Sequence, residues 1–506
     1  MSIINKDTLF LIFGKLQEDP KSLFSCLMVN RLWCETMVPV LWRNPWSYND
    51  IKYKTKSYLF IILARYLFDD IKKFITDQRI HLNTDIVKSP LFDYLSFCRS
   101  INVNTINSII SIGSPLPYNQ FSMQQKFYSL LLRKCPELKY FDMRSLKHQI
   151  FYFPEAKVRL ETLCELKCDT LIDSSYFYGL SRDCQLIQKL IIFNMDPRPN
   201  NGIVKLIEVQ KNLNHFEWSD SFDDEYFMND PYKEILLALE KKAESLKYLS
   251  IVFQYVEGYE HTTLQEILPK LYKLKVLFIN ASICFTEHQL KQLKMQTYNE
   301  LEILYMDENE LNFYSNIVEN SGGHLKKILF KPYDVIDFEL DHDYFNENSL
   351  NFIRKVYKTC PLIEYLSILI SSTKENFSEL EKLLKICQNL KSLLIVALDD
   401  DDNYTNEGFS EYGKELLKIL IRSAPTNLKE IRLGREFKFS LEDLEEFLEE
   451  WKGRRALSIF IVATIYMEDD YIELINKYKS NGVIKDFVCL SNAHRINYCI
   501  DDLKLS

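Results

Sequence analysis

The stretch Leu246-Lys-Tyr-Leu249-Ser-Ile251 decides the fold, because its spacing of apolar residues returns along most of the chain. An apolar residue is followed by two variable residues, an apolar residue, one variable residue and a third apolar residue. Clear copies start at Leu138, Ile187, Leu213, Leu246, Leu274, Leu301, Leu325, Ile363, Leu390 and Leu428, and weaker copies start at Leu160 and Ala456. Neighbouring starts are separated by 22 residues, as from Leu138 to Leu160, up to 38 residues after Leu325. Such a period is typical of a repeat protein.

Amphipathic stretches at 232–244, 349–359 and 377–387 lie between copies of this pattern. Each copy therefore predicts a short strand, and each intervening stretch predicts a helix that returns the chain. Strand–helix–strand connections of one hand give parallel strands. We expect an α/β fold in which stacked repeats share one core and form a curved solenoid with a parallel sheet. An ordinary doubly wound α/β domain is the alternative, and the near-equal periods count against it.

The N-terminal stretch 4–46 has a different pattern. Leu9, Ile12, Phe13 and Leu16 form one apolar stripe of a helix, for which Asn5 is a plausible N-cap. Phe10 and Leu11 widen this stripe until the helix is apolar most of the way round. Such a helix favours burial on more than one side.

Two more helices are predicted in this stretch. Asp19-Pro20 has the form of an N-cap followed by proline at the first helical position, and Asn30 is a candidate cap for the next helix. Pro39 is expected to close that helix near Val38. Three helices in about 40 residues cannot bury this much apolar surface alone. They form either the first layer of a larger helical domain or a docking module that covers its second face with a partner.

The spacing of apolar and polar residues from Ile4 to Trp42 resembles an F-box, with Asn5 where that family usually has proline. Together with the repeats, which have the spacing of leucine-rich repeats, the chain resembles the fungal-type F-box and leucine-rich-repeat protein family. The resemblance implies that the first stretch binds a Skp-type adaptor. The residues that it assigns to adaptor binding are Ile4, Leu9, Ile12, Phe13, Leu16, Leu23, Leu27, Val29, Trp33 and Pro39.

The chain is accordingly divided into an F-box at 1–46, a helical connector at 47–120 and a leucine-rich-repeat solenoid with a C-terminal cap at 121–506. In the connector we expect helices over 58–67 and 91–112, and Gly113-Ser-Pro-Leu-Pro117 is a breaker. The connector has no catalytic signature and is interpreted as a packing bridge.

The composition limits the partners and the cellular location that we expect for this protein. The net charge of −9 disfavours nucleic acid or an anionic membrane as the main partner, and no apolar run reaches the 18 residues of a membrane span. The chain begins directly with the F-box-like helix, so we expect no signal peptide and a cytoplasmic or nuclear protein. The 12 cysteines lack a CxxC pair and are interpreted as reduced core thiols, such as Cys135, Cys360 and Cys387.

The sequence offers no catalytic set, so we expect a protein that is not an enzyme and needs no cofactor. Only 12 glycines are present, and neither GxGxxG nor the GxxxxGK[ST] loop occurs. Cys164 and Cys168 have no second ligand pair for zinc. The acidic run 399–402 lacks the glycine and glutamate of a calcium loop and is interpreted as a solvated loop.

Residues between the apolar positions of each strand are expected to line an exposed face of the sheet. Tyrosine is prominent among them, and tyrosine is enriched in protein interfaces. The positions predicted to bind a target are His215, Glu217, Tyr248, Tyr305, Tyr365 and Arg432. Acidic loops at 220–225, 307–310 and 399–402 either favour a basic partner segment or are simply solvated.

The resemblance implies the substrate-recognition subunit of an SCF-type cullin–RING ubiquitin ligase, in which the adaptor holds the F-box and the repeats bind an unknown target protein. The alternative is a non-catalytic scaffold that binds the adaptor without delivering a target for ubiquitin-dependent degradation.

Overall fold

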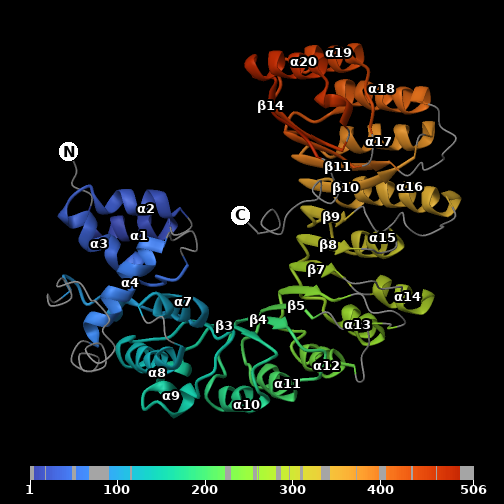
Figure 1. The fold of residues 1–506 in the computed structure, drawn as a ribbon. Coiled ribbons are helices and arrows are strands. Elements are labelled where there is room, and N and C mark those ends of the chain that lie inside the picture. The colour runs from blue at the N-terminus through green and yellow to red at the C-terminus, as the bar shows by residue number, and fades with distance from the viewer. Residues whose placement is uncertain are drawn as a thin grey trace. The chain divides into compact units, whose positions relative to one another are not determined.

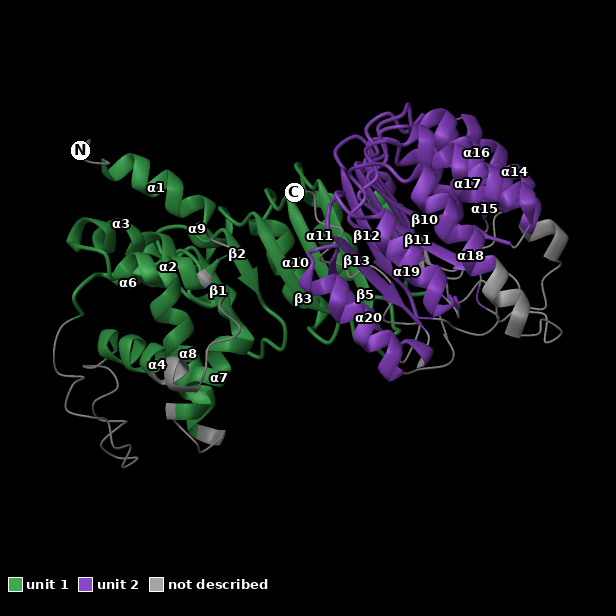
Figure 2. Ribbon diagram, turned by 90° about the horizontal axis from the view of Figure 1, so that it is seen from above, with its two compact units in different colours: residues 1–239 green, residues 240–506 purple. Residues whose placement is uncertain are grey.

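The computed structural model divides into two compact units, unit 1 at Met1–Leu239 and unit 2 at Glu240–Ser506 (Figure 2). The ranges that the structure describes are 5–16, 19–47, 53–67, 90–113, 117–222, 230–254, 259, 261–280, 286–295, 297–307, 311–331, 342–371, 373–397, 406–434, 437–462 and 464–490. Within these ranges, unit 1 contains a three-helix module, a connector and strands β1 to β5, and unit 2 contains β6 to β14.

The three-helix module (residues 5–47) begins unit 1 (Figure 1). Its helices are α1 (Lys6–Lys15), α2 (Pro20–Leu27) and α3 (Arg31–Leu41). Each begins at the predicted cap. The side chains of Asn5, Asp19 and Asn30 accept hydrogen bonds from the backbone N–H three residues on, at 2.8, 3.1 and 3.0 Å. These bonds satisfy N–H groups that have no partner inside the helix.

The module has its own small core. The ring of Trp33 packs edge-on against Phe13, with 5.3 Å between the ring centroids. The buried residues of this core are Leu9, Phe13, Leu23, Met37, Val40 and Leu41. One side of each helix is thereby covered within the module itself.

Pro39 lies inside α3, so the prediction that this helix closes near Val38 is wrong. A proline removes only its own N–H donor from the helix. The next turn stays bonded, since the N–H of Trp42 donates to the carbonyl of Val38 at 2.9 Å. Val40 and Leu41 are also buried in the module core, and this packing favours the last turn of the helix.

The connector contains the first strand of the sheet. Its elements are α4 (Tyr53–Tyr66), α6 (Tyr94–Phe97), β1 (Ser100–Asn102), α7 (Val103–Gly113) and α8 (Pro117–Lys134). The helix predicted at 58–67 is confirmed, and the breaker separates α7 from α8 as expected. The prediction of helix over 91–112 is wrong where β1 interrupts it. The reason is tertiary pairing, because Ile101 is buried beside Phe141 of the next strand.

The repeats of unit 1 continue from β1. Their strands are β2 (Tyr140–Asp142), β3 (Glu165–Asp169), β4 (Lys189–Asn194) and β5 (His215–Asp220). The intervening helices are η2 (Ile150–Tyr152), α9 (Ala156–Leu160), α10 (Ser174–Asp183) and α11 (Asn201–Val209), and α12 (Lys233–Glu240) closes the unit. Neighbouring strands from β1 to β5 pair in parallel, in chain order.

Unit 2 repeats this arrangement. Its strands are β6 (Tyr248–Val252), β7 (Val276–Asn280), β8 (Ile303–Asp307), β9 (Lys327–Lys331), β10 (Tyr365–Ile370), β11 (Ser392–Ala397), β12 (Glu430–Gly434), β13 (Leu457–Ile461) and β14 (Ile484–Cys489). All neighbouring pairs are parallel. The prediction of successive parallel strands is therefore confirmed within each unit.

The helices of unit 2 lie on one side of its sheet (Figure 1). They are α13 (Thr262–Ile267), η3 (Leu268–Lys270), α14 (Glu287–Met295), α15 (Leu311–Glu319), α16 (His342–Thr359), α17 (Lys374–Ile386), α18 (Asn406–Ser423), α19 (Leu441–Glu450), η4 (Thr464–Met467) and α20 (Asp469–Ser480). The core lies between these helices and the strands. Ile328, Leu366 and Leu393 occupy the same place in three neighbouring strands and are fully buried.

Two details of the repeat prediction need correction. The weak copy placed at Leu160 falls at the end of α9, and the strand uses Leu163 and Leu166 instead. The pattern also misses β14, whose residues Lys485 and Asp486 interrupt its apolar run. Leu163, Leu166 and Cys168 have the spacing of the pattern, three residues after the start that was predicted, and all three are buried. β14 lacks the pattern and is recognised by its parallel pairing with β13.

The ten cysteines in the described ranges are all free thiols. Cys135, Cys360 and Cys387 are buried as expected, and burial raises the pKa of the Cys387 thiol to about 12. Across the described ranges, no helix has the length and apolar character needed to cross a bilayer.

Candidate functional site

The three-helix module leaves a large apolar surface uncovered. Leu11 on α1 is 72% exposed and Met28, just after α2, is 86% exposed. The large apolar side chains that the module exposes are Phe10, Leu11, Ile12, Phe24, Met28 and Val29. We call this set the outer apolar face of the module. So many exposed large apolar side chains on one small module are typical of a surface that another protein covers.

Helix geometry explains why α1 is apolar on both sides. Successive residues turn by about 100° around a helix axis, so Leu9 and Phe13 share one side while Leu11 points to the other. Gly14 follows Phe10 by about one turn, and a Cβ atom built on it meets nothing within 4 Å. A partner can therefore approach the backbone of α1 at this point without a clash from the module.

The residues assigned to adaptor binding fall into three environments. Leu9, Phe13 and Leu23 have no exposed surface, so they shape the module from its core and offer no direct contact. Ile12 and Val29 belong to the outer apolar face. The residues that are half-buried are Leu16, Leu27, Trp33 and Pro39, and Ile4 lies outside the described residues.

Met28 and Phe24 are exposed on the module, although neither is among the residues that the sequence assigned to adaptor binding. Met28 lies at the C-cap of α2, where the chain leaves the helix before α3 begins at Arg31. Phe24 precedes it by one turn and is 48% exposed. The signal was present in the sequence, because Leu23 and Phe24 are adjacent and cannot both face the core of one helix.

The sheet of unit 2 differs from the exposed face that strand alternation predicts. β6 alternates as expected, with Leu249 and Ile251 buried and the residues between them half-buried. In β11, all six residues are buried, including the outward positions Leu394 and Val396. Strands of a parallel sheet that are covered on both faces read as continuous apolar runs, and the sequence SLLIVA of β11 is such a run.

Tyr305 is buried, with 6% of its surface exposed, so the prediction that it offers an accessible anchor is wrong. The physical reason is a neighbouring aromatic residue. Phe278 on β7 pairs with Tyr305 on β8, and their rings stack at 4.3 Å with an angle of 6° between the planes. Offset stacking of this kind covers the face of each ring.

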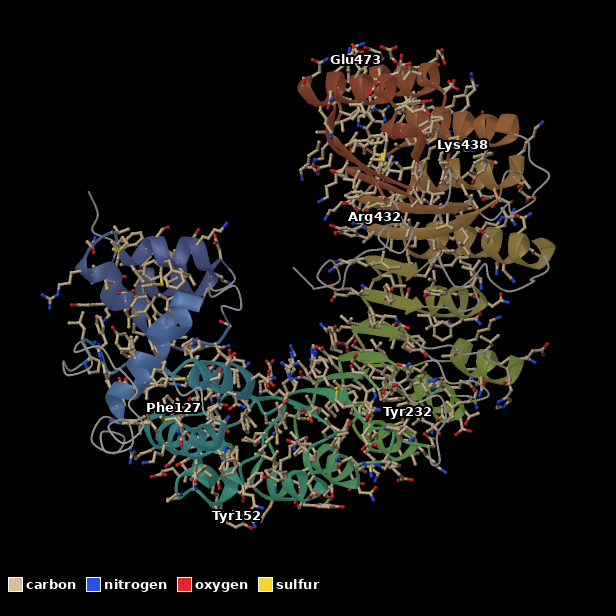
Figure 3. All side chains as sticks on the ribbon, in the orientation of Figure 1. Phe127, Tyr152, Tyr232, Arg432, Lys438 and Glu473 are labelled. Carbon is tan, nitrogen blue, oxygen red and sulfur yellow. The ribbon has the colours of Figure 1, made fainter. Side chains whose placement is uncertain are left out.

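Arg432 on β12 is also buried, at 8% exposure, which corrects its assignment as an exposed contact. Figure 3 shows it on the strand side of the sheet, away from α17 and α18. Its guanidinium donates to Glu430 at 2.7 Å and lies 4.8 Å from the ring centroid of Phe460 on β13. The positive charge of Arg432 is therefore paired within the sheet.

Tyr248 and Tyr365 remain partly accessible on the strands of unit 2. Tyr365 on β10 pairs with Lys327 on β9, whose ammonium lies 4.9 Å from the centre of the tyrosine ring. This cation–π contact orients the ring without covering it completely. Of the three tyrosines predicted to bind a target, Tyr248 and Tyr365 are therefore the two that a partner can reach.

His215 and Glu217 lie on β5 of unit 1, where charged groups form a cluster. Nε2 of His215 and Oε1 of Glu217 are 2.5 Å apart, and Lys189 lies 3.8 Å from Glu217. Burial opposes the charge of the Glu217 carboxylate, but the hydrogen bond from His215 and nearby positive charges hold its pKa below the usual value. These side chains are half-buried and largely satisfied by one another.

The acidic loops lie mostly outside the described residues. Asp220 is described, and it accepts hydrogen bonds from Trp218 at 2.8 Å, Asn194 at 2.8 Å and Tyr232 at 2.6 Å. This carboxylate therefore organises the end of β5 and is not a solvated loop acid. In the described part of the chain, no group of three or more His, Cys, Asp or Glu side chains has the arrangement to hold a metal ion.

Comparison with known proteins gives no match to any family model and none to any curated protein. Among solved structures, a chain in "Crystal structure of Rad7 and Elc1 complex in yeast" is similar over 97% of this chain and 96% of that one, with 10% sequence identity and a TM-score of 0.41.

Proposed function

We propose that the chain is the substrate-recognition subunit of an SCF-type ubiquitin ligase, in which the three-helix module is an F-box that binds a Skp-type adaptor. The single observation that carries this proposal is the outer apolar face. It lies on helices whose sequence spacing resembles an F-box, and it leaves Leu11 and Met28 more than two-thirds exposed. A stable monomer gains nothing from exposing these side chains, whereas a partner that covers them gains the free energy of their burial.

The face has the chemistry of a protein interface. Its members are apolar, and the space beside Gly14 on α1 is open. Burying one large apolar side chain contributes about 1.5–3 kcal/mol. A few such side chains offset the entropy lost on association, so Leu11, Met28 and Phe24 are the expected centre of the interface.

The proposal assigns no chemistry to the chain itself. The repeats would bind the target protein, and the ligase would gain its rate from holding target lysines near a charged ubiquitin-conjugating enzyme. Tyr248 and Tyr365 support a target site on the strands of unit 2, since both are partly accessible and aromatic. Tyr305 is buried and is left out of this proposed site.

The adaptor role is tested by exchanging exposed members of the face while leaving the core intact. Leu11→Ser with Met28→Ser should reduce co-purification of a Skp-type adaptor about tenfold or more, because two apolar contacts are lost. The matched control is Leu91→Ser, since Leu91 is 83% exposed but lies in the connector. Circular dichroism should show equal helix content in all variants. Full adaptor binding by the folded double variant would refute the role of this face.

The receptor and the scaffold are separated by target turnover. Tyr248→Ala with Tyr365→Ala should keep adaptor binding and release specific proteins that co-purify with the wild type. For a receptor, these proteins should accumulate in cells, and blocking cullin activity should abolish the difference. Released proteins whose turnover stays unchanged in both conditions would favour the scaffold.

A further inference from the structure

The three-helix module is bonded to the first strand of the sheet in unit 1. Within the described part of the chain, β1 pairs only with β2, so its other edge has no strand beside it. Residues 43–46, which directly follow α3, lie at this edge. The backbone N–H of Arg99 donates to the carbonyl of Arg43 at 2.9 Å. The indole N–H of Trp46 donates to the carbonyl of Ser100, also at 2.9 Å. The module therefore satisfies two of the backbone groups that an open strand edge would expose.

The bond to Arg43 continues a pattern that the repeats of unit 1 share. At the start of β2, the N–H groups of Lys139 and Tyr140 both donate to the carbonyl of Arg99, at 2.8 and 3.1 Å. The same arrangement, in which two adjacent N–H groups donate to one carbonyl of the repeat before, occurs at the starts of β3, β4 and β5. At β1, Arg99 makes the first of these bonds, and the carbonyl of Arg43 takes the place of the preceding repeat. By its backbone bonds, the end of the module thus occupies the position of a repeat.

Side chains close this joint against water. Trp46 and Ser100 are each 2% exposed, although they are 54 residues apart in the sequence. The hydroxyl of Ser100 donates to the side chain of Asn44 at 2.9 Å. The ring centroids of Trp42 and Tyr94 lie 4.5 Å apart. Few contacts cross the boundary between independent domains, so these contacts join the module and the first repeats of unit 1 as packed neighbours.

We propose that the three-helix module is the N-terminal cap of the repeat array, and that covering its outer apolar face stabilises the first strands of unit 1. Each unit of a repeat protein is stabilised mainly by its neighbours, and the terminal units need a cap. A ligand that binds only the folded module stabilises every element that unfolds together with it. The joint makes β1 and β2 such elements. The nature of the ligand, a Skp-type adaptor, rests on the proposed function, whereas the cap does not.

The cap is tested first without any partner, by hydrogen exchange of backbone amides in the full chain. Leu9→Ala with Phe13→Ala removes two fully buried side chains of the module core, so the module should open. If the module is the cap, the amides of Arg99, Lys139 and Tyr140 should then exchange about tenfold faster or more. The amides of β10 to β12 in unit 2 should exchange as in the wild type. Unchanged exchange at β1 and β2 would show an independent module and overturn the proposal.

A purified Skp-type adaptor provides the second test. At an adaptor concentration of about ten times Kd, the same amides should exchange about tenfold more slowly, because the adaptor stabilises the module and the strands joined to it. Trp46→Phe keeps an aromatic ring but loses the indole N–H. It should reduce this slowing to roughly threefold or less, because a weaker joint lets the strands open without the module.

The matched control is Trp451→Phe in unit 2. Trp451 is 1% exposed, and its indole N–H donates to the carbonyl of Arg455 at 3.0 Å, so the substitution removes the same kind of bond far along the chain. This variant should leave the effect of the adaptor on β1 and β2 unchanged. Equal effects of Trp46→Phe and Trp451→Phe would show that the joint does not carry the coupling and would overturn the proposal.

Two further outcomes separate the cap from the adaptor role. An adaptor that binds but changes exchange only within the module would overturn the coupling. Failure of the adaptor to bind would refute the proposed function instead, and the variant of the module core would still decide whether the module is the cap.

Discussion

The outer apolar face of the module and the outward face of the unit 2 sheet carry similar side chains in opposite environments. On the module, Leu11 and Met28 are mostly exposed. On the sheet, Leu329 and Leu394 have no exposed surface, although strand alternation places them on the side away from the helices. Apolar character alone therefore does not identify a binding surface. Accessibility must be added to it, and Leu11 and Met28 on the module have that accessibility.

The largest difference is expected between variants of buried and of exposed apolar residues on the same helix, α1. Leu9→Ala with Phe13→Ala should unfold the module, because each substitution costs about 2–5 kcal/mol at a fully buried position. Leu11→Ala with Ile12→Ala should change the free energy of unfolding by less than about 0.5 kcal/mol per residue. Chemical denaturation followed by circular dichroism measures both. Equal losses would mean that the face is covered within the folded chain.

A second pair of variants tests whether the outward face of the unit 2 sheet is buried. Leu394→Ala should destabilise unit 2 by about 2–5 kcal/mol, since it leaves a cavity at a position without exposed surface. Leu362→Ala is the matched control, because Leu362 is 58% exposed just before β10. It should cost less than about 0.5 kcal/mol. A small loss for Leu394→Ala in a denaturation curve would contradict the burial of the outward face.

The stacked pair on the same face gives a smaller effect. Tyr305→Leu keeps an apolar side chain but loses the ring contact with Phe278, so we expect a loss of about 0.5–1.5 kcal/mol. Tyr248→Leu should be nearly neutral, because Tyr248 is only half-buried. Thermal unfolding of the two variants provides the measurement. A larger loss of stability for Tyr248→Leu than for Tyr305→Leu would contradict the burial of Tyr305.

The smallest effect concerns charge on the helix side of unit 2. Hydrogen bonds from Lys385 and Arg422 lower the pKa of Glu381 to about 2. Its folded pKa is depressed, so its stabilisation is present above pH 4.5 and is lost as the pH falls towards 2. The pairs reach the surface, so the loss should stay below about 1 kcal/mol. Glu381→Gln should flatten this part of the stability–pH curve, and an unchanged curve would contradict the assignment.

Several features were predictable because they depend on neighbours along the chain. The N-caps at Asn5, Asp19 and Asn30 lie where short polar side chains precede apolar stretches, and each makes the expected bond. Most repeat copies became strands because a periodic apolar pattern fixes both the strand and its buried side. The outer apolar face could also be anticipated, since helix α1 has more apolar residues than one side can hold.

The remaining features were decided by tertiary packing. β1 is a strand because β2 lies beside it, and α3 continues past Pro39 because its last turn is buried in the module core. Tyr305 is inaccessible because Phe278 occupies the neighbouring strand, and Arg432 is occupied by Glu430 and Phe460. Local sequence determined where most helices and strands form, because their signals lie within one stretch of chain. Contacts between elements decided the exceptions, and they decided which side chains a partner can reach.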